Sequence, residues 1–559
     1  MNSLFTDKVD KTLPLPEYPR PQLVRDNWLN LNGKWNYAFT ESAHRPNKYD
    51  GEILVPFSPE CELSGVCRTL KPGEYLWYER FFTIPESFKG KHVILHFGAV
   101  DCEAWVYVNG QLATHHIGGY LPFSSDISSL IGLDRNEIVV KVRDDSDTSF
   151  HSRGKQSSRR GGIWYSPQSG IWQTVWIEAV PDKHIGSLRI TPSFADGSVT
   201  ICADVDDAVA VFEGELFHLP ATIKVNNFVP WSPENPKLYY FSVICGEDKV
   251  DSYFAIRDLS VGVDEYGTKR LFLNGKPYFN NGLLDQGYWP DGLYTAPTDE
   301  AMVYDITLAK QMGFNCLRKH IKIEPLRWYY HCDRLGIIVW QDMVNGGGKY
   351  NQLLVTAPLV TNIHIRDSHY SLFSRRDADG RNEYYSELKE TIDLLYSCPS
   401  VCMWVLFNEG WGQFDVQRVY EYARTLDNTR VYDTVSGWHD QGIGELRSWH
   451  VYFRKYTFKK DRHNRAVILS EFGGYSLKEN GHTFNSKFFG YKRLNSSEEL
   501  KIALFDLYRN EIMPSKSKGL AAAIYTELTD VEDELNGLIT YDRKVIKIAP
   551  DEVKKIVSI

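Results

Sequence analysis

Apolar and polar side chains alternate with a period of two through much of residues 1–182, which is the pattern of half-buried β-strands. Residues 93–97 alternate in this way, and residues 104–108 lead into Asn109-Gly110, a pair typical of hairpin turns. Further strands are predicted at residues 77–82, 137–142 and 173–178. Because no useful helical period interrupts them, the pattern predicts an N-terminal β-sandwich of the jelly-roll type.

Residues 183–262 continue the β-strand pattern, with dense turns around the proline-containing stretch 231–239. The length of this region and its turn density are typical of a small sandwich of immunoglobulin size. We therefore expect a second, immunoglobulin-like β-sandwich here.

From residue 263 onward the period changes, and strands alternate with helices. Helices are predicted at residues 299–312 and 325–335, each followed by a glycine that ends it. Eight short apolar strands are predicted at residues 278–281, 314–317, 337–340, 401–407, 431–435, 449–453, 467–470 and 520–526. Eight strand–helix units in this length predict a (β/α)₈ TIM barrel over residues 263–559.

Composition narrows the classes of function. The net charge of −9 argues against a nucleic-acid partner, because phosphates require a basic face. The aromatic content of 14% suits a carbohydrate site as well as it suits β-sheet packing. No apolar run approaches the ~20 residues that cross a bilayer. The N-terminus lacks the pattern of a signal peptide, so we expect a cytoplasmic protein without a membrane partner.

Two glutamates follow apolar runs that we predict to be the fourth and seventh barrel strands. Residues 403–407 precede Glu409, and residues 467–470 precede Glu471. Because TIM-barrel chemistry takes place at the carboxyl ends of the strands, the two side chains are expected to converge at the barrel mouth. A single glutamate in such a place more often faces water or caps a helix. A converging pair is what two-carboxylate cleavage of a glycosidic bond requires.

Several motifs occur in a fixed order around these glutamates. They are residues 28–35, 162–172, 314–318 (Phe-Asn-Cys-Leu-Arg), 332–336, Asn408-Glu409-Gly410 and Ser470-Glu471-Phe472-Gly473. With these motifs the chain resembles glycoside hydrolase family 2, the family of β-galactosidases, β-glucuronidases and β-mannosidases. The resemblance spans nearly the whole chain and implies the same order of jelly roll, immunoglobulin-like module and barrel.

The resemblance also implies a retaining mechanism in an exo-acting pocket. Glu409 matches the general acid/base, whose pKa should be raised, and Glu471 matches the nucleophile that forms a covalent glycosyl-enzyme. Asn408 matches the residue that hydrogen-bonds the sugar 2-hydroxyl. Arg318 matches the arginine that keeps the nucleophile ionised, and Tyr452 resembles the tyrosine that bonds it.

Two further side chains are candidates for the lining of the mouth, namely Trp438 and His320, and plain packing explains either of them equally well. His320 follows Arg318 by two residues, whereas much of the family places its histidine three residues after the arginine. The long segment 343–382 has little periodicity and is expected to act as a lid over the substrate pocket.

The sugar is less constrained. The Asn-x-Lys motif of the family's glucuronidases is missing near residues 534–541, so a uronate would be buried without a cation there. Residues 339–343 resemble the third strand of mannosidases, but nothing else in the barrel singles them out. We therefore expect β-galactosidase activity. The alternatives are β-mannosidase, β-glucuronidase or α-L-arabinosidase activity, or an inactive carbohydrate-binding protein.

Cysteine and carboxylate patterns indicate no metal site. The nine cysteines contain no C-x-x-C pair, and no carboxylate constellation matches the magnesium or sodium sites of some family members. We expect that no cofactor is required. Whether the chain forms a homo-oligomer stays open.

Overall fold

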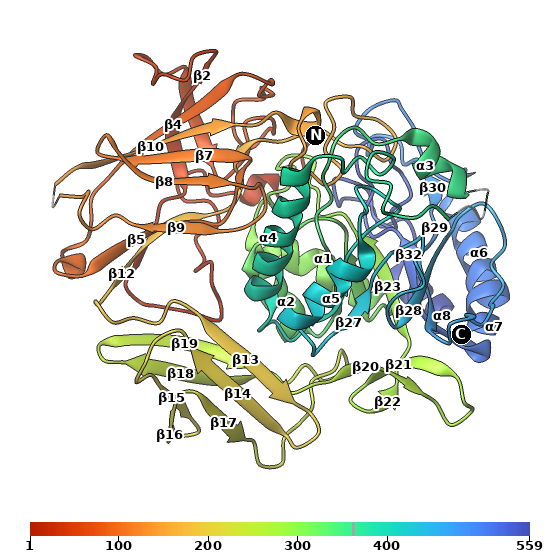
Figure 1. Cartoon of the computed structure of the whole chain (residues 1–559). Helices are drawn as coiled ribbons and strands as arrows, with labels where there is room; N and C mark the ends of the chain where they lie inside the picture. Colours follow the sequence, from red (N-terminus) through yellow and green to blue (C-terminus); the bar gives the residue numbers. More distant parts are fainter. Residues whose placement is uncertain (133, 360, 362–363, 559) are drawn as a thin grey trace.

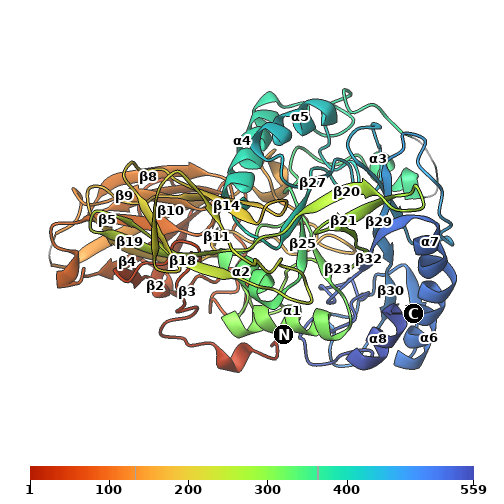
Figure 2. The same cartoon turned by 90° about the horizontal axis from the view of Figure 1, so that it is seen from below.

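The computed structural model describes residues 1–558 except 133, 360, 362 and 363. Its strands form two sandwiches and a barrel, so the expected multidomain fold class is confirmed. The two sandwiches lie on the same side of the barrel (Figures 1 and 2). None of the helices in the described part of the chain is long and apolar enough to cross a bilayer.

The first sandwich consists of two antiparallel sheets, drawn in red to orange in Figure 1. One sheet has the order β1 (Trp28–Asn30), β12 (Val175–Val180), β5 (His92–Phe97) and β9 (Phe123–Asp126). The other has the order β3 (Gly51–Val55), β2 (Gly33–Thr40), β4 (Tyr75–Phe82), β10 (Asn136–Arg143), β7 (Glu103–Val108) and β8 (Gln111–Ile117). A short pair, β6 (Val100–Asp101) and β11 (Gly170–Ile171), joins them at one end. Alternate side chains of both sheets form one core between them.

The second sandwich packs a three-stranded sheet against a four-stranded one. The first has the order β13 (Leu188–Ser193), β14 (Ser198–Ala203) and β17 (Ala221–Lys224). The second has the order β16 (Glu215–His218), β15 (Val209–Phe212), β18 (Tyr239–Cys245) and β19 (Asp248–Phe254). A separate apolar core lies between them. Seven short strands in two sheets give the expected immunoglobulin-like architecture.

A buried ion network joins the two sandwiches. Arg25 donates through Nη1 to Glu178 Oε2 at 3.0 Å and through Nη2 to Asp248 Oδ2 at 2.8 Å. Arg20 donates to the same oxygen of Glu178 at 2.5 Å. Burial alone would raise the pKa of Glu178, but Arg20, His96 and Arg25 lower it to about 2. The carboxylate is therefore held ionised between two arginines.

A small sheet covers the bottom of the barrel and crosses the domain boundary that we predicted at residue 262. Strand β20 (Leu259–Val263) pairs with β21 (Lys269–Leu273), which forms a hairpin with β22 (Lys276–Pro277) around Asn274-Gly275. Side chains of β20 and β21 share a core with the inside of the barrel. The hairpin was expected from the sequence, but its pairing with β20 was not. The predicted boundaries at residues 182 and 262 stay predictions.

Eight parallel strands form the barrel wall. In sheet order they are β27 (Val431–Asp433), β26 (Val401–Val405), β25 (Ile338–Asp342), β24 (Cys316–Lys319), β23 (Asn280–Asp285), β32 (Leu520–Thr526), β29 (Ala466–Gly473) and β28 (Leu446–Val451). The first and last of them along the chain, β23 and β32, pair with each other. At the seam between β27 and β28, Ser436 Oγ lies 2.9 Å from His450 Nε2. Most strand ends differ by one to four residues from the predicted ones, because apolar periodicity does not mark where a ladder starts or stops.

Helices cover most of the barrel, but not all of it. They are α1 (Asp299–Gln311), α2 (Leu326–Leu335), α3 (Gln352–Thr356), α4 (Ala378–Leu395), α5 (Val416–Leu426), α6 (Ser497–Leu507), α7 (Met513–Lys518) and α8 (Pro550–Val557). The connections before and after β28, residues 434–445 and 452–465, contain no helix. The expectation of eight complete strand–helix units is therefore wrong at two of them.

The segment predicted as a lid partly lies outside the described residues, because it contains residues 360, 362 and 363. Its described part includes α3 and packs over the barrel mouth. Tyr350 stacks on Trp411 with 6.4 Å between ring centroids, and His439 Nε2 lies 3.0 Å from the carbonyl oxygen of Leu354. A role as a moving lid stays a prediction.

Candidate active site

Glu409 and Glu471 meet at the carboxyl ends of the barrel strands, as the sequence predicts. One carboxylate oxygen of each and a ring nitrogen of His450 all lie within 4.8 Å of one another. Glu409 is 8% exposed and Glu471 is 4% exposed. A buried carboxylate pair this close has its two pKa values pushed apart by charge repulsion and by unequal partners.

The backbone around Glu409 turns sharply at the end of β26. Glu409 has a φ of +50°, a conformation that non-glycine residues rarely adopt. Its N–H donates to the carbonyl oxygen of Ser436 at 2.9 Å, and Asn408 forms a bridge with the same residue. The neighbouring strand end therefore holds Glu409 in this unusual conformation, and strain of this kind often accompanies a functional side chain.

Glu471 lies within β29, two residues before its end, and not just after a strand as we predicted. The register of β29 against β32 shifts between Leu469 and Phe472, which places Ser470 and Glu471 in a bulge. Bulges next to active sites redirect a side chain without ending the strand. In this case the bulge explains why an apolar run is interrupted by a buried acid.

Strong donors hold the carboxylate of Glu471. Arg318 Nη1 donates to Oε1 at 3.0 Å, and Tyr452 donates its hydroxyl proton to Oε2. Burial would raise the pKa of Glu471, but His450, Arg318 and His320 lower it to about 2. The group is therefore a carboxylate at neutral pH, as a nucleophile must be.

Glu409 has the opposite shift. Burial is the main cause that raises its pKa, and the negative charge of Glu471 adds to it. His450 limits the rise, because its Nδ1 lies 2.7 Å from Glu409 Oε1. The pair thus combines one ionised carboxylate with one whose proton is retained to higher pH, which is the division of roles in two-carboxylate catalysis.

Arg318 organises several predicted residues at once. It donates through Nε and Nη2 to Asp342 at 3.0 and 2.9 Å, and through Nη2 to Asn408 Oδ1 at 2.8 Å. The amide nitrogen of Asn408 is buried and has no partner among the described residues. Because its oxygen accepts from Arg318, the amide of Asn408 is held with its N–H₂ group free to donate.

His320 belongs to this network and not to a free wall of the mouth. Its Nδ1 lies 2.8 Å from Asp342 Oδ2, and its ring meets the edge of Trp411 at 6.2 Å. Burial and the charge of Lys155 hold the pKa of His320 well below its usual value. The residue is therefore linked to Arg318 by the carboxylate of Asp342, which both of them contact.

Aromatic rings surround the pair. Tyr452 stacks face to face on Tyr491, with 3.9 Å between ring centroids. Trp438 meets the ring of His450 at 5.3 Å, and its indole N–H has no partner among the described residues. The structure thus brings all seven predicted site residues into one network, or beside it. Their functional roles stay predictions.

Sequence reasoning missed three side chains of this network. His450 and Asp342 stand at the ends of β28 and β25, where polar residues in apolar strands were an available signal. Lys155 comes from the first sandwich, and its ammonium lies 4.0 Å from Glu534 Oε2. Nothing in its local sequence connects it with residues of the barrel.

Glu409, His450 and Glu471 place one potential ligand atom each close enough together to hold a metal ion. The group Asp101, Cys102 and Asp144 does the same. In the group around Glu471, however, Arg318 and Tyr452 each donate to one carboxylate oxygen. A cation bound there would lie beside the positive charge of Arg318. The donor set therefore fits an acid–nucleophile pair better than a metal centre.

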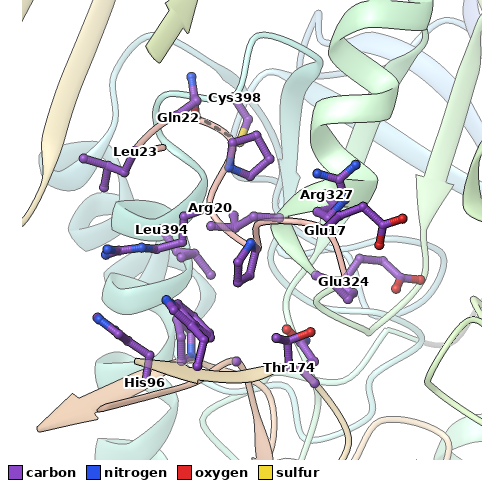
Figure 3. A pocket seen from close by; sticks show the side chains of 18 of the residues that line it. Glu17, Arg20, Gln22, Leu23, His96, Thr174, Glu324, Arg327, Leu394 and Cys398 are labelled. Atoms are coloured by element: carbon purple, nitrogen blue, oxygen red, sulfur yellow. Dashed lines mark hydrogen bonds between the residues drawn. The ribbon is translucent and has the colours of Figure 1, made fainter. Parts of the chain in front are cut away.

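A second cavity, of about 300 Å³, lies where the N-terminal segment crosses between the domains (Figure 3). Glu17, Arg20, Gln22 and Leu23 come from that segment, and the opposite walls come from β5, β12, α2 and α4. None of the predicted site residues lines it. The cavity is therefore separate from the catalytic pair.

Family comparisons agree with this geometry. Residues 266–555 match the model of the glycosyl hydrolases family 2 TIM barrel domain, and residues 66–181 match the model of the family 2 sugar binding domain. The first match alone covers more than half of the chain. The chain belongs to glycoside hydrolase family 2.

Curated family 2 relatives differ in the sugar that their names give. A β-galactosidase of Thermoanaerobacter pseudethanolicus is 24% identical over 441 residues, which are 72% of this chain and 54% of that protein. A putative β-glucuronidase of Formosa agariphila is 25% identical over 429 residues, covering 69% and 46%. The chain thus spans about half the length of the curated relatives it matches.

Solved family 2 structures resemble the whole chain. The β-D-glucuronidase of Dictyoglomus thermophilum has a TM-score of 0.75 at 19% identity and covers 97% of this chain and 98% of its own. A Ruminococcus gnavus β-glucuronidase also reaches 0.75, at 17% identity, and covers 96% and 98%. At this identity the likeness shows the shared fold, and the sugar must be argued from the site.

Proposed function

We propose that this chain is a retaining, exo-acting β-glycosidase that releases a terminal uncharged sugar, with β-galactosides as the first substrates to test. The observation that carries the proposal is the buried Glu409–Glu471 pair, with oxygens within 4.8 Å and opposite pKa shifts. Retaining enzymes place their carboxyl groups about 5–5.5 Å apart, whereas inverting ones leave about 6.5–9.5 Å for a water molecule. The separation in this site favours retention.

In the first step Glu471 attacks the anomeric carbon, and the bond to the leaving oxygen breaks. Glu409 gives its proton to that oxygen, and Glu471 becomes a glycosyl ester. Because this removes the negative charge of Glu471, the pKa of Glu409 falls, and Glu409 is left as a base. It then takes a proton from a water molecule, whose oxygen attacks the anomeric carbon and frees Glu471.

Enclosure of the mouth supports exo action. Trp164 of the first sandwich lies 5.1 Å from Trp411 between ring centroids, and Tyr350 of the long segment stacks on the same ring. The first sandwich and the long segment therefore both pack against Trp411, which lies two residues after Glu409. Aromatic walls contributed from outside the barrel would limit the length of the site, which suits the end of a sugar chain better than its middle.

An uncharged sugar is favoured by the acids that follow the last barrel strand. Glu527, Asp530 and Glu534 are buried there. Two buried cations of the same segment are already engaged, Lys547 by Asp530 at 2.7 Å and Arg543 by Asp305 at 3.0 Å. Burial and the neighbouring Glu534 already hold the pKa of Glu527 well above its usual value, so a further negative charge placed beside these acids would be disfavoured. The curated relatives include both β-galactosidases and putative β-glucuronidases, so the choice of a neutral sugar rests on the site, and the β-galactosidases make galactosides the first to test.

The test is hydrolysis of nitrophenyl β-galactoside, β-glucoside, β-mannoside, β-glucuronide and α-L-arabinoside, with Glu471→Gln beside the wild type. We expect a neutral glycoside to be cleaved with retained anomeric configuration, observed by NMR, and the variant to lose at least about 10⁴-fold in kcat. The exposed Glu421→Gln on α5 is the matched control and should keep full activity. Inverted product, or an active Glu471→Gln, would contradict the mechanism.

A further inference from the structure

Lys155 is a buried cation whose ammonium has no hydrogen-bond acceptor among the described residues. The residue is 5% exposed, and the closest carboxylate oxygen, in Glu534, is 4.0 Å from Nζ. The rings of Tyr165 and Trp411 lie 5.3 and 6.0 Å from Nζ. Nζ itself is not fully enclosed, so its protons are available to an acceptor that enters beside these groups.

The loop that carries Lys155 is fixed to the barrel. The N–H groups of Arg153 and Gly154 both donate to the carbonyl oxygen of Asn345, at 3.0 and 3.2 Å. Gly154 has a φ of +60°, and a Cβ atom there would lie 2.9 Å from the hydroxyl oxygen of Tyr294. A side chain at Gly154 would therefore separate the two domains, and its absence lets Lys155 reach the barrel mouth.

The charge of Lys155 acts on both catalytic glutamates, since it lowers the pKa of Glu409 and of Glu471. It acts also on Glu527, which directly follows β32 at the barrel mouth. Glu527 Oε2 accepts from Gln286 at 2.9 Å, but its buried Oε1 has no partner among the described residues. An unused donor and an unused acceptor thus lie close to the same pair of glutamates.

We propose that Lys155 and Glu527 together bind a neutral hydroxyl group of the sugar, so that the first sandwich contributes a specificity-determining residue to the barrel. A hydroxyl group can accept a hydrogen bond from the ammonium and donate one to the unpaired Oε1 of Glu527 at the same time. A sugar carboxylate would satisfy Lys155 but face Glu527 and Glu534. An amino sugar would satisfy the acids but face Lys155. This inference rests on the glycosidase activity proposed above.

The test compares Lys155→Met with the wild type on the preferred neutral glycoside and on its monodeoxy analogues. We expect kcat/KM to fall by about 10- to 100-fold on the parent sugar, the usual cost of losing a charged hydrogen bond. On the one analogue that lacks the bound hydroxyl group, the loss should be close to nothing. Glu527→Gln should also lower kcat/KM on the parent sugar but not on the analogue that lacks the same hydroxyl group.

Arg159→Met is the matched control, because it removes one positive charge from an exposed position of the same loop. It should leave kcat/KM unchanged on every sugar. Lys155→Gln, which keeps a neutral donor, covers the case in which the methionine variant does not fold. Folding of each variant is checked by its thermal midpoint.

Two results would overturn the inference. One is an equal loss on the parent sugar and on all deoxy analogues, which would make Lys155 a structural residue. The other is selective loss of β-glucuronide hydrolysis, which would make it a carboxylate-binding residue. If the wild type hydrolyses none of the glycosides, that result counts against the proposed activity instead. Calorimetric binding of galactose and of galacturonate to Glu471→Gln, with and without Lys155→Met, then decides the role of Lys155 separately.

Discussion

Nδ1 of His450 lies 2.7 Å from Oε1 of Glu409, and its other ring nitrogen lies 3.5 Å from Oε1 of Glu471. One imidazole thus contacts both carboxylates of the candidate pair. It lowers the pKa of each of them, and so it influences both sides of the pH profile.

The pH dependence of kcat/KM should be bell-shaped. Activity should rise as pH rises through the pKa of Glu471, about 2, and fall as pH passes the raised pKa of Glu409. In His450→Gln both limbs should move to higher pH, because each glutamate loses a partner that favours its ionised form. His115→Gln, which removes a surface histidine paired with Glu103, is the control. If neither limb of the pH profile moves in His450→Gln, His450 does not influence the pKa values of the two glutamates.

Glu409→Ala should separate the two chemical steps. With dinitrophenyl leaving groups the first step needs no proton, so the glycosyl-enzyme should accumulate, and azide should then release it as a glycosyl azide. With poor leaving groups kcat/KM should fall by about 10²- to 10⁴-fold. The measurement is burst kinetics with a series of leaving groups. A uniform loss along the series would remove Glu409 from the role of acid.

Tyr452→Phe should lower kcat by about 10- to 100-fold, because it removes a hydrogen bond to the nucleophile's carboxylate. Burial holds the pKa of Tyr452 well above its usual value, so the hydroxyl stays a donor throughout the working pH range. Tyr456→Phe is a close control, since Tyr456 is equally buried but its hydroxyl has no partner among the described residues. Equal kinetics for the two variants would show that the contact with Glu471 is unimportant.

Glu178→Gln should destabilise the junction of the two sandwiches by about 3–5 kcal/mol, because Arg20 and Arg25 lose a buried partner. In the wild type, the stabilisation from Glu178 is present above its usual pKa near 4.5 and is lost as pH falls toward about 2. Urea unfolding at several pH values measures both effects. Glu86→Gln, which breaks an exposed pair with Lys89, should change little. A Glu178→Gln variant with unchanged acid sensitivity would argue against this network.

The sequence predicts those parts of the fold that depend on local pattern. Alternation marked the sandwich strands, and Gly336 marked the end of α2 because its φ of +76° suits glycine. Glu409 and Glu471 could be found because each interrupts an apolar run at the carboxyl end of a strand. Local pattern could not reveal the bulge at Glu471, since register is decided by the neighbouring strand.

Contacts between distant segments were beyond that reasoning. The position of His320 was predicted, but its bond to Asp342 depends on how β24 and β25 lie beside each other. Lys155 could not be placed at all, because only domain packing brings a loop of the first sandwich to Glu534. The candidate pair can therefore be found from the sequence, whereas the groups that shift its pKa values can be found only from the structure.

The pairing of β23 with β32 also bears on how the protein is made. Gly282 lies opposite Ile524, so the first barrel strand acquires its second neighbour only when nearly the whole chain has left the ribosome. The strands of the first sandwich all lie between residues 28 and 180 and can fold much earlier. The sandwich that carries Lys155 is then folded before either glutamate has a barrel around it, whereas the loop at Lys155 gains its bonds to Asn345 only with the barrel. During synthesis, the barrel closes against a wall that is already in place, and a barrel expressed alone would have to close without it.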